Sequence, residues 1–319
     1  MQAAAAAPLL VVLTGPTGSG KSHHALQLVQ RLAGRVPIEI VSADSVQVYR
    51  GMDIGTAKPE RAIRERVPHH LIDIRDPAEV YSAGDFVREA SALITAIHLR
   101  GALPLLVGGT MLYLRALREG LATLPAASSD VRREIDAEAA VHGWAAMHQR
   151  LCRIDPQAAA RIAPQDAQRI QRALEVHRLT GVALSQWHDR TQDKRASYRW
   201  LRYALWPDSR SGLRVGLEAR FAAMMRAGLL DEVRRLYARG DLTAEHPSMR
   251  AVGYRQLWRY CANQLGLEAA CTAAVNATAQ LAKRQLTWLR RDREITTLRS
   301  EVVGIPERVA ADILAALGA

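Results

Sequence analysis

The stretch LLVVLTGPTGSGKS, residues 9–22, decides which fold the chain adopts. Its first part, residues 9–13, is a continuous apolar run with the length of a buried strand. Its second part, GPTGSGKS at residues 15–22, matches the phosphate-binding pattern G-x-x-x-x-G-K-[ST]. A helix-compatible run follows at once. This order of strand, glycine-rich loop and helix predicts the first unit of a parallel α/β sheet that carries a P-loop.

The residue types in this loop suit a phosphate ligand. The glycines permit a tight turn whose backbone N–H groups point at phosphate oxygens. Lys21 adds a positive charge, and the hydroxyl of Ser22 is a suitable ligand for Mg²⁺. A glycine-rich turn without a ligand is the alternative, but the full pattern and its strand-to-helix context argue against it. The predicted phosphate site comprises Gly15, Pro16, Thr17, Gly18, Ser19, Gly20, Lys21 and Ser22, with Ser22 as the metal ligand.

Further apolar runs extend the sheet. The first third of the chain adds IEIVS (38–42), HLIDI (70–74) and ALPLLVG (102–108), which alternate with helix-compatible segments as in a parallel sheet. From about residue 126 the spacing becomes helical, and no convincing strand occurs before about residue 199. The run WLRYALWP (200–207) then predicts a strand that returns to the sheet, followed by helices to the C-terminus.

We therefore expect an α/β fold with two parts. The first is a P-loop NTPase-like parallel sheet core with C-terminal helices, residues 1–120 and 200–319, and the second is a mainly helical insertion domain, residues 121–199. With 319 residues, of which 49% are hydrophobic, the chain is long enough to bury a core of this kind. No run of about 18 uncharged apolar residues occurs, so we expect no membrane span. The three cysteines lack CxxC spacing, which excludes a zinc site or disulfide framework of that type and favours a cytoplasmic protein.

The charge of the chain points to a polyanionic partner. The formal net charge is +11. Residues 1–160 carry 17 Lys and Arg against 16 Asp and Glu, whereas residues 161–319 carry 26 against 16. An excess confined to one half favours nucleic acid or an anionic membrane surface over a merely Arg-rich composition.

One carboxylate is a candidate catalytic base. An ordinary P-loop NTPase has a second strand that ends in an Asp, but here residues 102–108 run into Gly109 and Thr110. The strand at 38–42 is instead followed closely by Asp44, and parallel strands that end at one edge of a sheet share one site. We therefore expect Asp44 near the P-loop as a base, with a helix N-cap as the alternative role.

Several stretches resemble the tRNA dimethylallyltransferase (IPP transferase) family. The resemblance runs in order from about residue 9 to about residue 291. The matching stretches are GPTGSGKS (15–22), SADSVQVYRGMDIGTAKP (42–59), HHLIDI (69–74) with DP at 76–77, YSAGDF (81–86), VGGTMLYLRAL (107–117), QRIQRALEV (168–176), RFAAMMRAGLLDEV (220–233), SMRAVGYRQLW (248–258) and QLAKRQLTWLRR (280–291).

The resemblance implies a reaction. Members transfer a dimethylallyl group from dimethylallyl diphosphate to the N6 amine of the adenosine 3′ of the anticodon, position 37, in tRNAs that read codons beginning with U. By the family pattern Asp44 is the general base, Thr110 lies at the reacting centre, and Lys21, Ser22 and Arg220 hold the diphosphate with Mg²⁺. The chemistry agrees, because an adenine amine needs a base and a departing diphosphate needs positive charge.

The resemblance also implies tRNA contacts, mostly in the basic half of the chain. Arginines, lysines and Trp288 within residues 283–293 suit phosphate contacts and stacking, although a solvated basic helix face is the alternative. The helical insertion is expected to close over the anticodon stem-loop of a single tRNA bound by a monomer. The implied contact residues are Asp44, Ser45, Val46, Gln47, Thr110, Arg132, Gln168, Arg169, Ile170, Gln171, Arg172, Arg250, Ala251, Val252, Gly253, Tyr254, Arg255, Lys283, Arg284, Gln285, Leu286, Thr287, Trp288, Leu289 and Arg290.

The chain departs from the family pattern at one position, and other functions compete with the implied one. Members often carry an Arg four residues before the one matched by Arg220, where this chain has Gly216 and, two residues earlier, Arg214. A small-molecule P-loop kinase would share the P-loop but not the basic C-terminal half. An RNA-binding protein without activity would not need Asp44. Within the same chemistry, the alternative is an adenylate-type isopentenyltransferase that acts on free adenine nucleotides.

Overall fold

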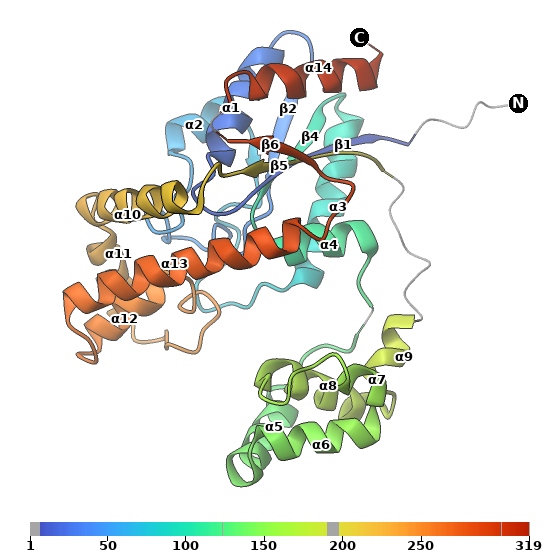
Figure 1. Ribbon diagram of the computed structural model, residues 1–319, viewed down its shortest axis with the longest axis vertical. Helices are drawn as coiled ribbons and strands as arrows, with labels where there is room; N and C mark the ends of the chain where they lie inside the picture. Colours follow the sequence, from blue (N-terminus) through green and yellow to red (C-terminus); the bar gives the residue numbers. More distant parts are fainter. Residues whose placement is uncertain (1–6, 123, 190–197, 301, 319) are drawn as a thin grey trace, which may run out of the picture. The chain divides into compact units, whose positions relative to one another are not determined.

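The computed structural model describes residues 7–122, 124–189, 198–300 and 302–318. They belong to two compact units, Met1–Leu114 with Ser197–Ala319 and Arg115–Ala196. The first unit contains a sheet with helices around it, and the second is helical (Figure 1). Among the described residues, no helix is both long enough and apolar enough to cross a membrane.

The first unit is built on a parallel sheet. In the described residues its strand order is β3-β2-β4-β1-β5-β6, and each neighbouring pair runs parallel. The strands are β1 (Leu9–Thr14), β2 (Ile38–Ser42), β3 (His69–His70), β4 (Leu103–Gly108), β5 (Arg199–Trp206) and β6 (Thr296–Arg299). The α/β class with a parallel sheet is thus confirmed, and β5 returns to the sheet beside β1 as predicted.

Two expectations about strands were wrong. The run 70–74 was predicted as a strand, but only His69–His70 pairs with β2. Leu71 and Asp73 have φ angles of 61° and 57°, which turn the chain away while Leu71 stays buried. Strand β6 was expected to be helix; it is four residues long, lies at the sheet edge and buries Leu298 alone, so it carries almost no apolar pattern.

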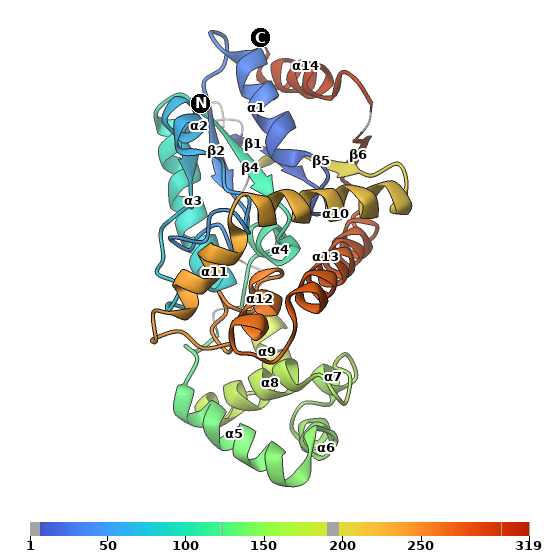
Figure 2. The same ribbon diagram turned by 90° about the vertical axis from the view of Figure 1, so that its left-hand side faces the viewer.

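Helices cover both faces of the sheet. On one face, α1 (Lys21–Leu32) and α14 (Ile305–Leu317) pack against each other and against the core side chains of β1, β4 and β5. On the other face lies α3 (Ala83–Leu99), whose Phe86 and Ile94 are fully buried (Figure 2). Coverage on both sides explains why the central strands are continuous apolar runs rather than alternating ones.

The first unit contains further helices besides those that cover the sheet. Helices α10 to α13 pack on one another in sequence, and α10 also packs against α13. Helix α4 runs from the first unit into the second. These helices are α2 (Arg61–Arg66), α4 (Met111–Glu119), α10 (Arg210–Arg226), α11 (Leu229–Tyr237), α12 (Tyr254–Cys261) and α13 (Leu267–Leu289).

The second unit is a small helical bundle with its own core. Its helices are α5 (Ser129–His142), α6 (Trp144–Ile154), α7 (Pro156–Ala159), α8 (Ala167–Thr180) and α9 (Leu184–Asp189). Ile135, Met147 and Leu151 are among the buried side chains that pack between them. Ser128 and Asp166 cap α5 and α8 by accepting backbone N–H bonds, which satisfies donors that a helix start leaves free.

Candidate active site

The P-loop connects the carboxyl end of β1 to the N-terminus of α1. Gly15, Gly18 and Gly20 all have positive φ angles, and Gly20 is the N-cap of α1. Gly18 also lies under α10, because a Cβ there would be 2.8 Å from Cδ2 of Leu217. Glycine is therefore required at residue 18 for its backbone angle and for space.

Lys21 places its ammonium group at this loop. Its Nζ donates a hydrogen bond to the Pro16 carbonyl at 2.7 Å. Burial lowers the pKa of Lys21 to about 8, opposed by the negative charge of Asp44 and assisted by the positive charge of Arg220. Three charged groups from three distant segments thus act on one another here. An anion bound at the loop would favour the charged form of Lys21.

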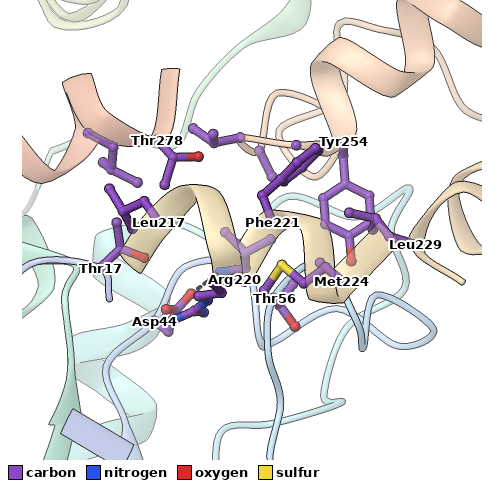
Figure 3. A pocket seen from close by; sticks show the side chains of 16 residues that line it. Thr17, Asp44, Thr56, Leu217, Arg220, Phe221, Met224, Leu229, Tyr254 and Thr278 are labelled. Atoms are coloured by element: carbon purple, nitrogen blue, oxygen red, sulfur yellow. Dashed lines mark hydrogen bonds between the residues drawn. The ribbon is translucent and has the colours of Figure 1, made fainter. Parts of the chain in front are cut away.

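Asp44 follows β2 at the same edge of the sheet. Its Oδ1 accepts hydrogen bonds from the backbone N–H groups of Val46 at 2.9 Å and Gln47 at 3.4 Å. Residues 45–48 form a turn and not a helix, so the helix N-cap alternative is wrong, although one carboxylate oxygen does bind backbone amides of this turn. The side chain of Arg220, from α10, lies beside Asp44 (Figure 3). Burial lowers the pKa of Arg220, and the Asp44 charge counteracts this effect.

Thr110 is tied to the segment that carries Asp44. It follows β4, and its hydroxyl accepts a hydrogen bond from the Ser45 N–H at 3.0 Å and lies 3.3 Å from the Ser45 hydroxyl. Its own N–H donates to the Ala43 carbonyl at 3.2 Å. The ends of β2 and β4 are thereby joined in front of the P-loop.

Two adjoining cavities open onto these groups. The larger, about 490 Å³, is lined by the P-loop, residues 44–47, Thr110, Arg220 and residues of α13. The smaller, about 130 Å³, shares Thr17, Asp44 and Arg220 with the first. Its other walls are largely apolar and include Leu217, Phe221, Met224, Leu229 and Tyr254 (Figure 3).

The residues at 283–290, which the family pattern assigned to tRNA contact, are partly exposed and partly buried. Lys283, Arg284, Thr287, Trp288 and Arg290 are exposed, and Arg284 and Trp288 line the larger cavity. Gln285, Leu286 and Leu289 are buried. Arg290 lies over the ring of Trp206, with 5.5 Å between its guanidinium carbon and the ring centroid.

The segment 250–255 also contains both exposed and buried residues. Arg250 and Arg255 are exposed, and Arg250 forms an ion pair with Glu245. Gly253 and Tyr254 are buried, and residues 251–254 line the smaller cavity. The side chain of Tyr254 therefore faces the protein interior.

In the second unit, two of the implied tRNA contacts share one buried carboxylate. Arg132 donates to Glu175 through Nε at 2.9 Å, and Arg172 donates to it at 2.7 Å. Of the other residues on α8, Gln168 and Arg169 are exposed, Gln171 bonds to Asp136 at 2.6 Å, and Ile170 is in the core of this unit.

The departure from the family pattern does not disturb α10. The helix begins at Arg210, and Gly216 is exposed with no atom within 4 Å of a Cβ built on it. Arg214 bonds to Glu218 at 3.0 Å and to Asn276 at 2.9 Å, and it does not line either cavity. It is therefore not a substitute for the missing arginine at this site.

The fold and the site define a class of protein, a P-loop α/β protein whose loop opens beside a carboxylate and an apolar cavity. Residues 47–292 match the model of the IPP transferase family, and the chain belongs to that family. The tRNA dimethylallyltransferase of Methylococcus capsulatus is 52% identical over 98% of this chain and 99% of its own length. That of Halorhodospira halophila is 54% identical over 89% of this chain and 90% of its own length.

Solved structures agree with this assignment. The tRNA isopentenylpyrophosphate transferase from Bacillus halodurans matches with a TM-score of 0.70 and 37% identity, and the match covers 98% of this chain and 97% of that one. A eukaryotic dimethylallyltransferase acting on tRNA matches with a TM-score of 0.79 and 26% identity, over 98% of this chain and 78% of that one. The family resemblance inferred from the sequence is confirmed.

Proposed function

We propose that this chain transfers the dimethylallyl group of dimethylallyl diphosphate to the N6 amine of adenosine 37 in tRNAs that read codons beginning with U. The observation that carries the proposal is the arrangement of Lys21, Asp44 and Arg220 where a P-loop cavity meets an apolar one. A diphosphate and a short hydrocarbon chain are the two ends of the donor. The names of the two relatives described above, both tRNA dimethylallyltransferases, support this substrate pair.

The P-loop holds the diphosphate in this proposal. Backbone N–H groups of the loop, among them those of Gly18 and Gly20, and the charges of Lys21 and Arg220 stabilise the negative charge that grows as the carbon–oxygen bond breaks. The apolar side chains around the smaller cavity take up the dimethylallyl group, which needs no hydrogen bonds.

Ser22 is the residue that would hold Mg²⁺ together with diphosphate oxygens. It stands at the first turn of α1 and lines the larger cavity beside Lys21. Among the described residues there is no cluster of three His, Cys, Asp or Glu side chains. The Ser22 hydroxyl together with diphosphate oxygens fits Mg²⁺, which commonly binds one or two protein oxygens plus phosphate oxygens and waters. When bound, the ion would neutralise part of the diphosphate charge.

Asp44 acts as the base toward the adenine amine. As the N6 nitrogen forms its bond to C1 of the dimethylallyl group, the bond from C1 to the diphosphate oxygen breaks and a proton leaves N6. Oδ1 of Asp44 is engaged with the amides of Val46 and Gln47, so Oδ2 is the oxygen that takes this proton. Thr110 keeps the Asp44 segment in place through its bond to the Ser45 amide.

The tRNA approaches over α13 and the segment 250–255. The adenosine must leave its stack to bring N6 to Asp44, and exposed Lys283, Arg284 and Trp288 suit phosphate contacts and stacking. In this proposal the helical domain, residues 121–199, closes over the anticodon stem-loop, and the protein works as a monomer in the cytoplasm.

The test is a transfer assay that separates the competing functions. Unmodified tRNA is incubated with the protein, dimethylallyl diphosphate and Mg²⁺, and its nucleosides are analysed by mass spectrometry; N6-isopentenyladenosine is expected. A tRNA with guanosine at position 37 serves as the control acceptor. Prenylation of AMP in place of tRNA would favour the adenylate-type enzyme, ATP turnover without RNA would favour a kinase, and tRNA binding without any product would leave only an RNA-binding role.

A further inference from the structure

Glu232 is a buried carboxylate that is held by hydrogen bonds instead of an ion pair. It lies in the first turn of α11 and is 2% exposed. Its Oε2 accepts the N–H groups of Asp53 and Ile54, both at 2.9 Å, and its Oε1 accepts the N–H of Gly55 at 3.2 Å and the hydroxyl of Tyr254 at 2.5 Å. Four donors compensate the cost of burying this charge.

The turn at residues 53–55 packs closely against Tyr254 and Leu229. A Cβ at Gly55 would lie 2.5 Å from the ring of Tyr254 and 2.8 Å from Cδ1 of Leu229. The turn can therefore sit in only one register on α11 and α12. Burial and the Glu232 charge both raise the pKa of Tyr254, which keeps its hydroxyl protonated as a donor.

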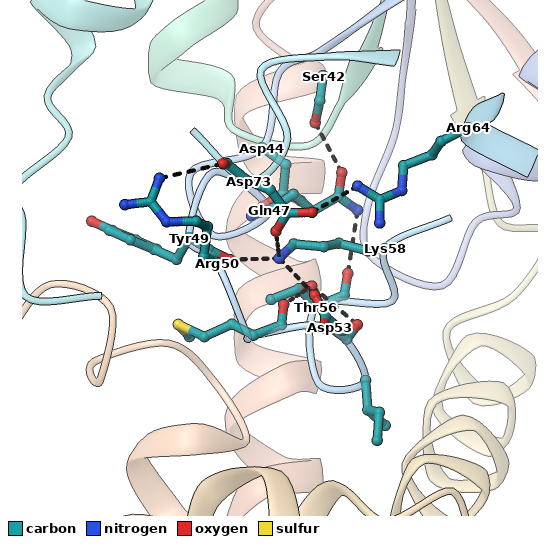
Figure 4. A network of polar contacts seen from close by, with 12 residues as sticks. Ser42, Asp44, Gln47, Tyr49, Arg50, Asp53, Thr56, Lys58, Arg64 and Asp73 are labelled. Carbon is teal, nitrogen blue, oxygen red and sulfur yellow. Dashed lines mark hydrogen bonds and ion pairs between the residues drawn. The ribbon is translucent and has the colours of Figure 1, made fainter. Parts of the chain in front are cut away.

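Hydrogen bonds and ion pairs connect the parts of the loop from Asp44 to Lys58. The side-chain amide of Gln47 donates to the carbonyls of Thr56 at 3.3 Å and Ala57 at 3.5 Å. The ammonium group of Lys58, whose side chain is 2% exposed, donates to the Tyr49 carbonyl and pairs with Asp53 and Asp73 (Figure 4). The segment that follows the turn 53–55 is therefore hydrogen-bonded to Gln47, which lines the larger cavity.

Tyr254 links Glu232 to a second segment of the chain. It is the first residue of α12 and follows Ala251 and Val252, which line the same small cavity as Asp44. Glu232 is thus the point at which the Asp44 loop and the segment 250–255 are joined.

We propose that Glu232 is a positioning residue for prenyl transfer. By fixing the turn 53–55 on Tyr254, it sets the distance between Asp44 and the apolar cavity, and hence between the base and the reacting carbon. The inference rests on the proposed function, because that function makes Asp44 the base.

The test is Glu232→Gln, which keeps the size of the side chain but turns an NH₂ group toward backbone donors. We expect the single-turnover rate at saturating tRNA and donor to fall about 10²-fold, and the donor Kd to change by less than about threefold, because a misplaced base slows chemistry without emptying the P-loop. Amide hydrogens at residues 53–55 should exchange faster. Tyr254→Phe, which removes one donor of four, should show smaller changes in the same direction.

Asp231→Asn is the matched control. Asp231 is exposed and lies in the same turn of α11, and its substitution removes the same charge as Glu232→Gln. It should retain the wild-type rate. A wild-type protein that makes no prenylated tRNA overturns the proposed function and this inference with it. An active wild type whose rate and amide protection are unchanged in Glu232→Gln overturns the inference alone. If Glu232→Gln does not fold, a wild-type rate and wild-type amide protection in Tyr254→Phe overturn it.

Discussion

The side-chain oxygen of Gln285 accepts a hydrogen bond from the backbone N–H of Thr17 at 2.8 Å, across 268 positions of the sequence. The nitrogen of the same amide donates to the Gly109 carbonyl at 2.8 Å. Gln285 is 8% exposed, so both bonds are shielded from water. Helix α13, which presents the exposed basic residues, is thus attached directly to the P-loop and to the end of β4.

Replacing Gln285 with Met should weaken donor binding more than tRNA binding. The change leaves the Thr17 N–H and the Gly109 carbonyl without partners, which costs about 1–3 kcal/mol per buried group and loosens the P-loop. Donor affinity measured calorimetrically without tRNA should fall, while tRNA affinity stays close to that of the wild type. Gln280→Met, at an exposed position of the same helix, is the control. The reverse pattern, a loss of tRNA affinity alone, would assign Gln285 to RNA contact.

Asp44→Asn separates base catalysis from positioning. Asn retains Oδ1, which makes the two capping bonds, and replaces Oδ2 with an amide that cannot accept the proton. The chemical step measured in single turnover should slow by about 10² to 10⁴, while both substrates still bind. Near-normal chemistry with weakened tRNA binding would make Asp44 a recognition group and leave the departing diphosphate as the proton acceptor.

Lys21→Ala should abolish turnover with tRNA binding nearly intact, because its charge serves the diphosphate. The pKa of Lys21, lowered to about 8, adds a pH signature. Above this value the free enzyme loses the ammonium charge, so donor affinity should fall by up to about tenfold per pH unit. Donor binding near pH 8 should also take up a proton, which calorimetry in buffers of different ionisation enthalpy detects. Lys21→Arg should remove this dependence; if the wild-type affinity does not change up to about pH 9, Lys21 is not the diphosphate cation.

The exposed basic residues of α13 should control the salt dependence of tRNA binding. The double variant Lys283→Ala and Arg284→Ala should lower the slope of log K against log salt by about 1 to 2 units, because each phosphate contact contributes slightly less than one. Donor binding should barely change. The variant Arg31→Ala with Arg61→Ala removes the same charge from exposed positions on α1 and α2 and should leave the slope intact. Equal slopes for both double variants would mean that this face of α13 is solvated surface.

Gly216→Ala should stabilise the protein. Gly216 is an exposed interior residue of α10 with open space around its Cα, so Ala gains about 0.5–1 kcal/mol of unfolding free energy. Gly18→Ala should do the opposite, since its φ is 81° and Leu217 blocks a side chain. Denaturant unfolding of both variants checks the signs; a destabilised Gly216→Ala would show that this turn of α10 is not helical in solution.

The sequence predicted the central strands because burial on both faces makes them uninterrupted apolar runs. The same rule failed at residues 70–74, since a buried residue such as Leu71 can lie in a turn, and periodicity does not reveal its φ angle. It also failed at β6, where only Leu298 is buried. At residues 70–74 and at β6, the structure therefore depends on contacts with distant parts of the chain, which the local apolar pattern does not show.

The site was predictable where a local pattern encodes it and not where backbone groups do the binding. The P-loop motif located Lys21, and the rule that parallel strands end at one edge of a sheet placed Asp44 near it. By contrast, three of the donors to Glu232 are backbone amides at distant positions of the sequence; Asp53, for example, is 179 positions away. An acidic residue at a helix start looks the same in the sequence whether it caps the helix or clamps a distant loop.

The position of β1 between β4 and β5 has a consequence for synthesis on the ribosome. When β1 and the P-loop leave the exit tunnel, neither neighbour of β1 has been made; β4 begins at Leu103, and the other edge of β1 stays unpaired until β5, which begins at Arg199. The nascent chain must keep this apolar edge from pairing wrongly while the whole helical unit is translated. Helix α14, which packs on α1, is translated after the other described elements. A premature stop after residue 290 would therefore release a chain that has every residue proposed for catalysis and lacks part of the core that supports the P-loop.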